Sequence, residues 1–306
     1  MLTHHVALVS NVRSIKPREL MRVSAALQKQ ATRDLGPIWG ISATVDSFAR
    51  LKDVPVGYWP IIVMADVQGA AGVHEDNNGQ PFALVEYGDS WTLTASHECL
   101  EMLVDPFGKE LRAGPTIASA AQASVQKKST SKKSPRQGRV QYLVEVCDPS
   151  ESEKYAYTSN DVLVSDFYTP AYFDPRASAG VRYSFTGALT APRQVLPGGY
   201  LSWYVPETGH WWQAEYYSAP NAPGPRIKDL GKLTGSSNLR TLVNSQTAGW
   251  RDLSTLPSNN AAMLMAQKVR TRCASATDAR AYRLDAQIEE LVAMARRSSS
   301  KTRRLR

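Results

Sequence analysis

The sequence contains few cysteines and no long apolar run. Cys99, Cys147 and Cys273 are the three cysteines among 306 residues, and none of them belongs to a C-x-x-C pair. Cysteines so few, so widely spaced and odd in number exclude a fold held together by disulfides, and they indicate a reducing compartment. No stretch approaches the roughly 18 apolar residues of a membrane-spanning helix, and the N-terminus lacks the basic leader of a secretory signal. We therefore expect a cytoplasmic protein, of a cell or a phage-infected cell, without membrane contact.

Acidic residues are missing from one long segment. The chain has 36 Lys and Arg against 28 Asp and Glu, a net charge of +8, yet no acidic residue lies between Leu111 and Arg139. Lys127–Arg139 interleaves basic residues with Ser, Thr, Gln, Pro and Gly, which predicts a flexible loop. A second basic stretch, Arg296–Arg306, ends the chain. Both stretches are candidate contacts for nucleic acid or other acidic partners; the alternative is that both are simply solvated.

Hydrophobic patterning in the first third of the chain predicts alternating strands and helices. The expected elements are a strand at Val6–Val9, a helix from Pro17 to about Asp34, strands at Ile41–Val45 and Tyr58–Val67, a polar loop at Gly69–Gln80, and an edge strand at Pro81–Gly88. Such alternation favours a mixed sheet with a helix packed on one face. The predicted fold class is therefore α+β.

Strand patterns dominate the second half of the chain. They predict strands at Val140–Pro149 and Val162–Val164, short strands at Val181–Ala188 and Gln194–Leu196, a β-hairpin turning at Pro206–Gly209, and an amphipathic helix at about Asp278–Arg297. We therefore divide the chain into an N-terminal subdomain (1–110), a basic flexible loop (111–139), a β-rich subdomain (140–257) and a C-terminal helical region with a basic tail (258–306).

Ionisable side chains gather on one predicted helix, which follows Asp89 or Ser90 and ends at Asp105 because a proline comes next. At about 100° per residue, His97, Glu98, Glu101 and Asp105 share one side and apolar residues share the other. The polar side is either a solvated acidic surface or a metal site. In the second interpretation His97 and Glu101, at i and i+4, bind one ion, and Glu98 is the general base for a metal-bound water.

A third metal ligand has to come from elsewhere in the chain. Asp148 ends the predicted strand after the basic loop, where a carboxylate can close a metal site; it is also a common turn opener. Asp105 and Glu145 are the alternatives. Zinc is the expected ion for such ligands, and other divalent metals are alternatives.

Three further side chains are weaker candidates. His74 lies in a predicted polar loop, where a lone histidine is usually solvated, although it could contact a ligand or substrate. Tyr168 and Tyr172 could each offer a phenol to a tetrahedral oxyanion, and structural packing is the simpler role for both.

The order of a strand, a long helix, two strands, an edge strand and an H-E-x-x helix resembles the N-terminal half of zincin metallopeptidases. Glu101 stands where most zincins have histidine, so the motif is H-E-x-x-E. The resemblance implies that the edge strand binds extended peptide, that His97 and Glu101 hold the metal, and that Glu98 is the base. Ser96–Pro106 followed by Glu145–Pro149 also resembles a group of hypothetical proteins from bacteria and their phages.

These observations favour a metal-dependent hydrolase, above all a zinc metallopeptidase acting on a peptide or protein substrate. The alternative is a non-catalytic interaction protein or phage structural protein. Its basic segments would contact nucleic acid or acidic partners.

Overall fold

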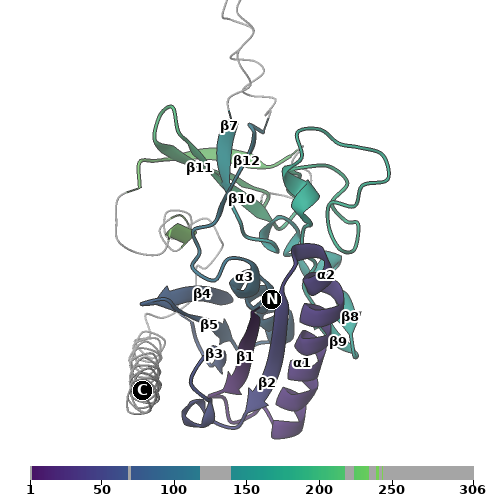
Figure 1. The fold of residues 1–306 in the computed structure, drawn as a ribbon, viewed down its shortest axis with the longest axis vertical. Coiled ribbons are helices and arrows are strands. Elements are labelled where there is room, and N and C mark those ends of the chain that lie inside the picture. The colour runs from purple at the N-terminus through teal and green to yellow at the C-terminus, as the bar shows by residue number, and fades with distance from the viewer. Residues whose placement is uncertain are drawn as a thin grey trace, which may run out of the picture.

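Two five-stranded sheets form the framework of a mixed α+β fold (Figure 1). The computed structural model describes residues 2–67, 70–117, 139–217, 224–233, 239–240 and 243. The predicted α+β class is confirmed for these residues. The helix predicted near 278–297, the segment 118–138 that holds most of the basic loop, and the basic tail all lie outside them.

The first sheet has the strand order β2-β1-β3-β5-β4. Its strands are β1 (Thr3–Ser10), β2 (Ser42–Phe48), β3 (Tyr58–Met64), β4 (Gly72–Asn77) and β5 (Gln80–Glu86). Neighbouring pairs among β2, β1, β3 and β5 are parallel, whereas β4 pairs antiparallel with β5. The β4–β5 turn places Asn78 (φ 51°) and Gly79 (φ 80°) in the left-handed region, which a two-residue hairpin turn with right-handed twist requires.

The predicted edge strand was wrong. Pro81–Gly88 corresponds to β5, which lies inside the sheet, while β4 forms the edge within the predicted polar loop. β5 is buried along nearly its whole length, as an interior strand covered on both faces should be. β4 carries polar side chains that gave no strand pattern, and its pairing with β5 decides its conformation.

Helices cover one face of this sheet. α1 (Pro17–Lys29) begins with proline at its first turn, continues through a π-helical stretch (Gln30–Leu35), and leads into α2 (Gly36–Trp39). α3 (Trp91–Val104) follows β5. Side chains alternate along β1: Val6 and Leu8 join the core beneath the helices, whereas Ala7 and Val9 join a smaller cluster apart from it.

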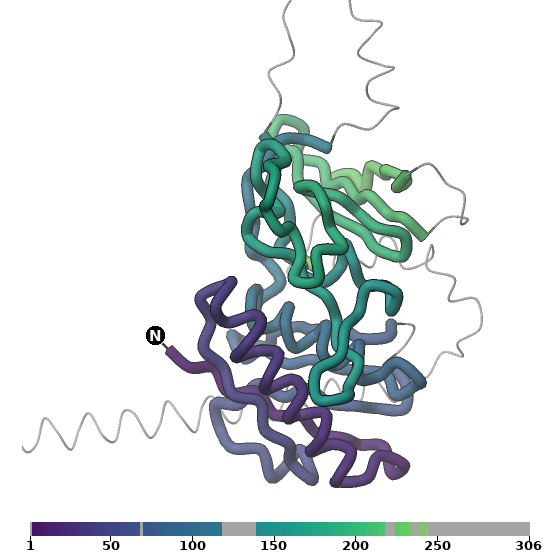
Figure 2. Tube along the Cα trace, turned by 90° about the vertical axis from the view of Figure 1, so that its right-hand side faces the viewer, coloured from purple at the N-terminus to yellow at the C-terminus, as the bar shows by residue number. Residues whose placement is uncertain are grey.

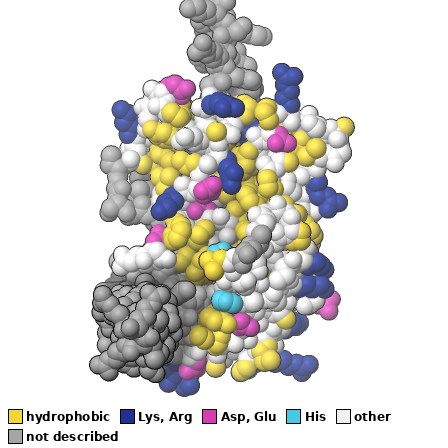
Figure 3. Space-filling view, in the orientation of Figure 1, with side chains coloured by type: hydrophobic (Ala, Val, Ile, Leu, Met, Phe, Trp, Pro, Cys, Tyr) yellow, Lys and Arg dark blue, Asp and Glu magenta, His cyan; other side chains and the backbone are white. Residues whose placement is uncertain are grey.

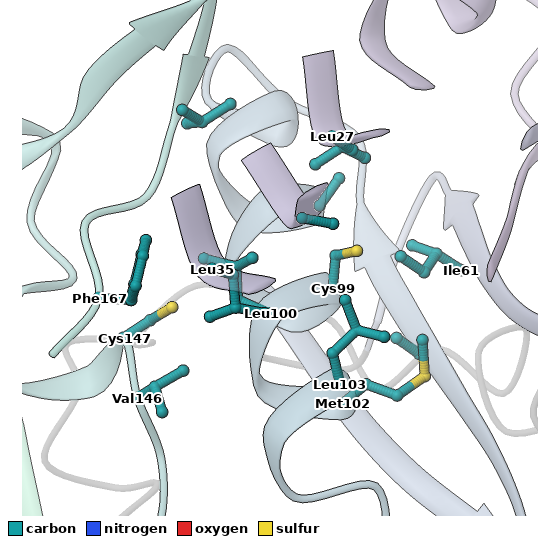
Figure 4. Packing of buried hydrophobic residues seen from close by; sticks show 14 of the residues in the cluster. Leu27, Leu35, Ile61, Cys99, Leu100, Met102, Leu103, Val146, Cys147 and Phe167 are labelled. Carbon is teal, nitrogen blue, oxygen red and sulfur yellow. The ribbon is translucent and has the colours of Figure 1, made fainter. Parts of the chain in front are cut away.

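The apolar side of α3 lies at the centre of the main core. Figure 4 shows Cys99 and Leu103 near Ile61 of the sheet, and Leu100 near Leu35 and Cys147. All six side chains are buried. α3 is therefore fixed from the sheet, from the end of α1 and from the second half of the chain at once.

The second sheet lies beyond α3 from the first (Figure 2) and has the order β12-β11-β10-β7-β6. Its strands are β6 (Leu111–Pro115), β7 (Arg139–Leu143), β10 (Tyr200–Val205), β11 (His210–Glu215) and β12 (Arg226–Gly231). The predicted hairpin is confirmed, with Trp203 opposite Trp212. The segment predicted as a loop from residue 111 starts with strand β6. β7 ends at Leu143, earlier than expected, because the chain then crosses toward α3.

A small hairpin, β8 (Tyr157–Ser159) with β9 (Val162–Val164), packs beside α1 and α3. The predicted strand at 162–164 is confirmed, but the strands expected at 181–188 and 194–196 are not formed; a single bridge joins Tyr168 to Ser184. No helix among the described residues is both long and apolar enough to cross a membrane. On the face drawn in Figure 3, Lys and Arg are spread among apolar and acidic side chains.

Candidate metal centre

The polar side of α3 is buried. His97 is 8% exposed, Glu98 2% and Glu101 0%. The interpretation of this side as a solvated acidic surface is therefore wrong. β4 packs against one part of the helix, and the segment after β7 covers another. Burying several ionisable groups together is costly unless they are paired or bind an ion.

His97 contacts both of the other residues predicted as metal ligands. His97 Nε2 lies 3.3 Å from Glu101 Oε1 and 3.1 Å from Asp148 Oδ1. Burial by itself would lower the pKa of His97, but the negative charge of Glu101 and the hydrogen bond to Asp148 raise it well above its usual value. In the absence of a metal, His97 is thus an imidazolium held between two carboxylates.

Asp148 reaches this point from a 3-10 turn (Asp148–Ser150), not from the end of a strand as predicted. Both of its carboxylate oxygens are buried, and Oδ1 lies 3.1 Å from His97 Nε2. Burial opposes ionisation, but the hydrogen bond with His97 and the charge of Arg240 lower the pKa of Asp148 below its usual value. Burial and the charge of Asp148 instead raise the pKa of Glu145 well above its usual value.

The alternative third ligands differ in position. Asp105 directly follows α3, and its Oδ2 accepts a hydrogen bond of 2.7 Å from the backbone N–H of Glu110. Asp105 is not one of the carboxylates in contact with His97. Glu145 lies in the cluster, next to Asp148. Sequence reasoning missed Glu151, which lies close enough to His97 and Asp148 for all three to hold one ion.

Two further members of the cluster were missed or undervalued. His74, assigned to a polar loop, lies on β4 with its ring fully buried, 3.4 Å from Glu98 and 3.7 Å from Glu101. Arg240 lies 142 positions beyond Glu98 in the chain and donates a 3.1 Å hydrogen bond to that carboxylate. No sequence pattern indicated either contact, because both depend on tertiary packing.

The donor set fits a divalent ion. Zinc bonds to imidazole nitrogen and carboxylate oxygen are about 2.0–2.2 Å long, so two ligand atoms of a tetrahedral zinc lie roughly 3.3 Å apart. The two His97 contacts, at 3.1 and 3.3 Å, have that spacing. Both carboxylate oxygens of Asp148 are buried, and a bound ion would give them a partner. The buried histidine and carboxylate groups of this structure could therefore hold a metal ion.

A cavity of about 150 Å³ adjoins the cluster. It is lined by Ala71, Gly72, Leu93, Thr94, His97, Glu98, Glu151, Tyr200 and Arg240. Gly72 of β4 lies directly against α3: a Cβ there would lie 2.5 Å from Thr94 Cγ2 and 2.7 Å from Glu98 Oε1. The missing side chain lets β4 lie directly against Glu98 and leaves room beside its outer oxygen.

Tyr168 and Tyr172 are fully buried and stack on each other with ring centroids 4.4 Å apart. The Tyr172 hydroxyl donates to Gln194 O at 2.8 Å, which fits a packing role. Burial, the neighbouring Tyr172 ring and the charges of the carboxylate cluster raise the pKa of Tyr168 well above its usual value. Tyr168 is therefore a neutral phenol close to the cluster.

Comparisons with known proteins assign no family to this arrangement. No protein-family model, no curated protein and no solved structure matches the chain. The site therefore has to be interpreted from its own chemistry.

Proposed function

We propose that this protein is a metal-dependent hydrolase of zincin type, most directly a zinc metallopeptidase. The main support for this proposal is the contact of His97 with two buried carboxylates, Glu101 and Asp148, at the spacing of metal ligands. These three residues would hold the ion, and Glu151, which lies close enough to His97 and Asp148 to share an ion with them, is a candidate further ligand. When bound, such an ion supplies Lewis acidity: it makes a water easier to deprotonate and polarises a scissile carbonyl.

Glu98 has the surroundings of a general base. Its Oε2 accepts a hydrogen bond from Arg240, while its Oε1 lies beside Gly72 at the cavity. Burial opposes ionisation, but the charge of Arg240 lowers the pKa of Glu98 to about 2, so the group is a carboxylate at neutral pH. One oxygen is thus anchored, and the other can take a proton from a water in the cavity and pass it to the leaving amine.

The arrangement of β4 supports a peptide substrate. β4 forms the edge of the first sheet and lies along α3, as an edge strand above the helix does in zincins. An extended peptide that pairs with β4 would pass close to Gly72 and so to Glu98. This assignment moves the substrate strand from Pro81–Gly88 to Gly72–Asn77.

Glu98→Gln tests the catalytic part of the proposal. Glutamine keeps the size and the hydrogen-bond acceptor for Arg240 but cannot take a proton at neutral pH. We expect hydrolysis of an unstructured protein substrate to fall about 10²–10⁴-fold while metal content stays unchanged. Chelation of the wild type should give the same loss, and added zinc should reverse it.

Glu110→Gln is the matched control, because Glu110 is an exposed carboxylate outside the cluster. It should leave the rate unchanged. A Glu98→Gln protein as active as the wild type would remove Glu98 from the mechanism and would contradict the peptidase proposal.

A further inference from the structure

Arg240 occupies the middle of the carboxylate cluster. Its guanidinium is 3% exposed, with Nη1 3.1 Å from Glu98 Oε2, Nη2 2.7 Å from Glu101 Oε2 and Nε 2.7 Å from Glu145 Oε1. The backbone N–H of Arg240 donates to Gly108 O at 3.1 Å, which fixes the residue beyond the end of α3. All three guanidinium nitrogens thus face protein carboxylates, so Arg240 balances their negative charge.

His74 completes the surroundings of this cation. Its Nε2 lies 3.0 Å from the backbone oxygen of Asp105, and a carbonyl can only accept, so Nε2 carries the proton. Nδ1 is then the acceptor, and it faces the Nη1 atom of Arg240. A backbone carbonyl that fixes the tautomer in this way is the usual support of a metal-ligating histidine.

The guanidinium of Arg240 is held by electrostatic attraction more than by well-aligned hydrogen bonds. Glu101 Oε2 and Glu145 Oε1 are buried and accept no directed hydrogen bond from the described residues, although each lies 2.7 Å from a guanidinium nitrogen. A planar guanidinium needs its N–H bonds aimed at the oxygens, whereas a spherical ion has no such requirement. A spherical ion could therefore take the place of the guanidinium between these oxygens.

Glu101 joins the two halves of the cluster. Its Oε1 faces His97 on the side of Asp148, and its Oε2 faces His74 and Arg240. Besides Glu151, which lies near His97 and Asp148, the set contains two imidazoles and four carboxylates: His74, His97, Glu98, Glu101, Glu145 and Asp148. Two imidazoles and four carboxylates, with shared carboxylates, form the donor set of two-metal centres in proteins.

We propose that His74, Glu98 and Glu101 form a second divalent-cation site, which the Arg240 guanidinium fills in the wild-type protein. The side chain and a second ion exclude each other, so Arg240 keeps the centre to one metal. It also keeps Glu98 from becoming a ligand, which leaves that carboxylate to act as a base. Only this last role rests on the proposed function; the second site does not.

Zinc stoichiometry of the full chain tests this inference. Wild type, Arg240→Ala, Arg240→Lys and Arg240→Ala/His74→Ala are dialysed against the same micromolar Zn²⁺ and analysed for zinc per chain. Arg240→Ala should hold about one more zinc than the wild type, because removal of the guanidinium opens the site to an ion. The double variant should return to the wild-type ratio. Arg240→Lys should also keep that ratio, because it retains the positive charge.

Thermal melting with and without Zn²⁺ keeps the test decisive if Arg240→Ala is poorly folded. Zinc should raise the melting temperature of this variant more than that of the wild type, since only the variant can exchange a lost cation for an ion. If the variant does not fold even with zinc, the same dialysis is applied to Arg240→Gln, which keeps most of the side chain. Equal zinc in the wild type and the folded Arg240 variant would overturn the inference. A zinc-free wild type beside a variant that binds one zinc would support it and refute the proposed function.

Discussion

The two sides of α3 are buried to a similar degree but against different chemistry. Leu100 and Cys99 on one side pack among apolar side chains of α1, the first sheet and the segment after β7 (Figure 4). Glu98 and Glu101 on the other side meet charged groups brought from distant parts of the chain. A buried ionic cluster is a poor source of stability, because desolvation offsets much of the attraction. The comparison therefore favours the apolar side as the part that fixes the helix, and under the proposed function the charged side holds the metal.

Leu100→Ala should weaken the packing on the apolar side of α3 without changing the charged side. Leu100 is fully buried, so loss of its side chain leaves a cavity in the main core. We expect the free energy of unfolding to fall by about 2–5 kcal/mol, measured by urea denaturation, with unchanged zinc content in the folded protein. Met21→Ala, at a position on α1 that is 62% exposed, is the control and should change stability little. Loss of zinc in folded Leu100→Ala would show that the two sides are not separable.

Ser96→Ala sharpens the comparison at the border between the two sides. The Ser96 hydroxyl donates to Gln30 Oε1 at 2.9 Å and accepts from the backbone N–H of Ser165 at 2.8 Å. The alanine variant leaves both buried partners unsatisfied, so we expect a loss of about 1–3 kcal/mol in urea denaturation.

Ser178→Ala, at an exposed position, is the matched control for Ser96→Ala and should have almost no effect. Equal stability of Ser96→Ala and wild type would mean that water replaces the hydroxyl, and that this junction contributes nothing to the position of α3.

The local part of the fold could be predicted from the sequence. The span of α3 followed from apolar periodicity and from Pro106, and its polar residues were grouped correctly because helix geometry decides which side chains share a side. The same information could not tell that this side is buried. Burial depends on what packs against the helix, and those segments come from β4 and from beyond β7.

The partners of the polar side carried no local signal. His74 lies on a strand of mixed polar residues, where pairing with β5 and not side-chain pattern decides the structure. Arg240 is one of 36 basic residues and lies in a weakly patterned segment. Asp148 was predicted because a carboxylate at the end of a strand can close a metal site, although the strand itself ends earlier and Asp148 lies in a 3-10 turn. Contacts across such sequence distances need the folded chain.

Metal content of the purified protein tests the central claim most directly. Wild type, His97→Ala and His210→Ala are purified without chelator and analysed for zinc and other divalent metals; His210 is a partly exposed histidine paired with Asp229 outside the cluster and serves as the control. We expect about one ion per chain in wild type and His210→Ala, and almost none in His97→Ala, which loses a ligand. A metal-free wild type that takes up no added zinc, or equal metal in wild type and His97→Ala, would contradict it.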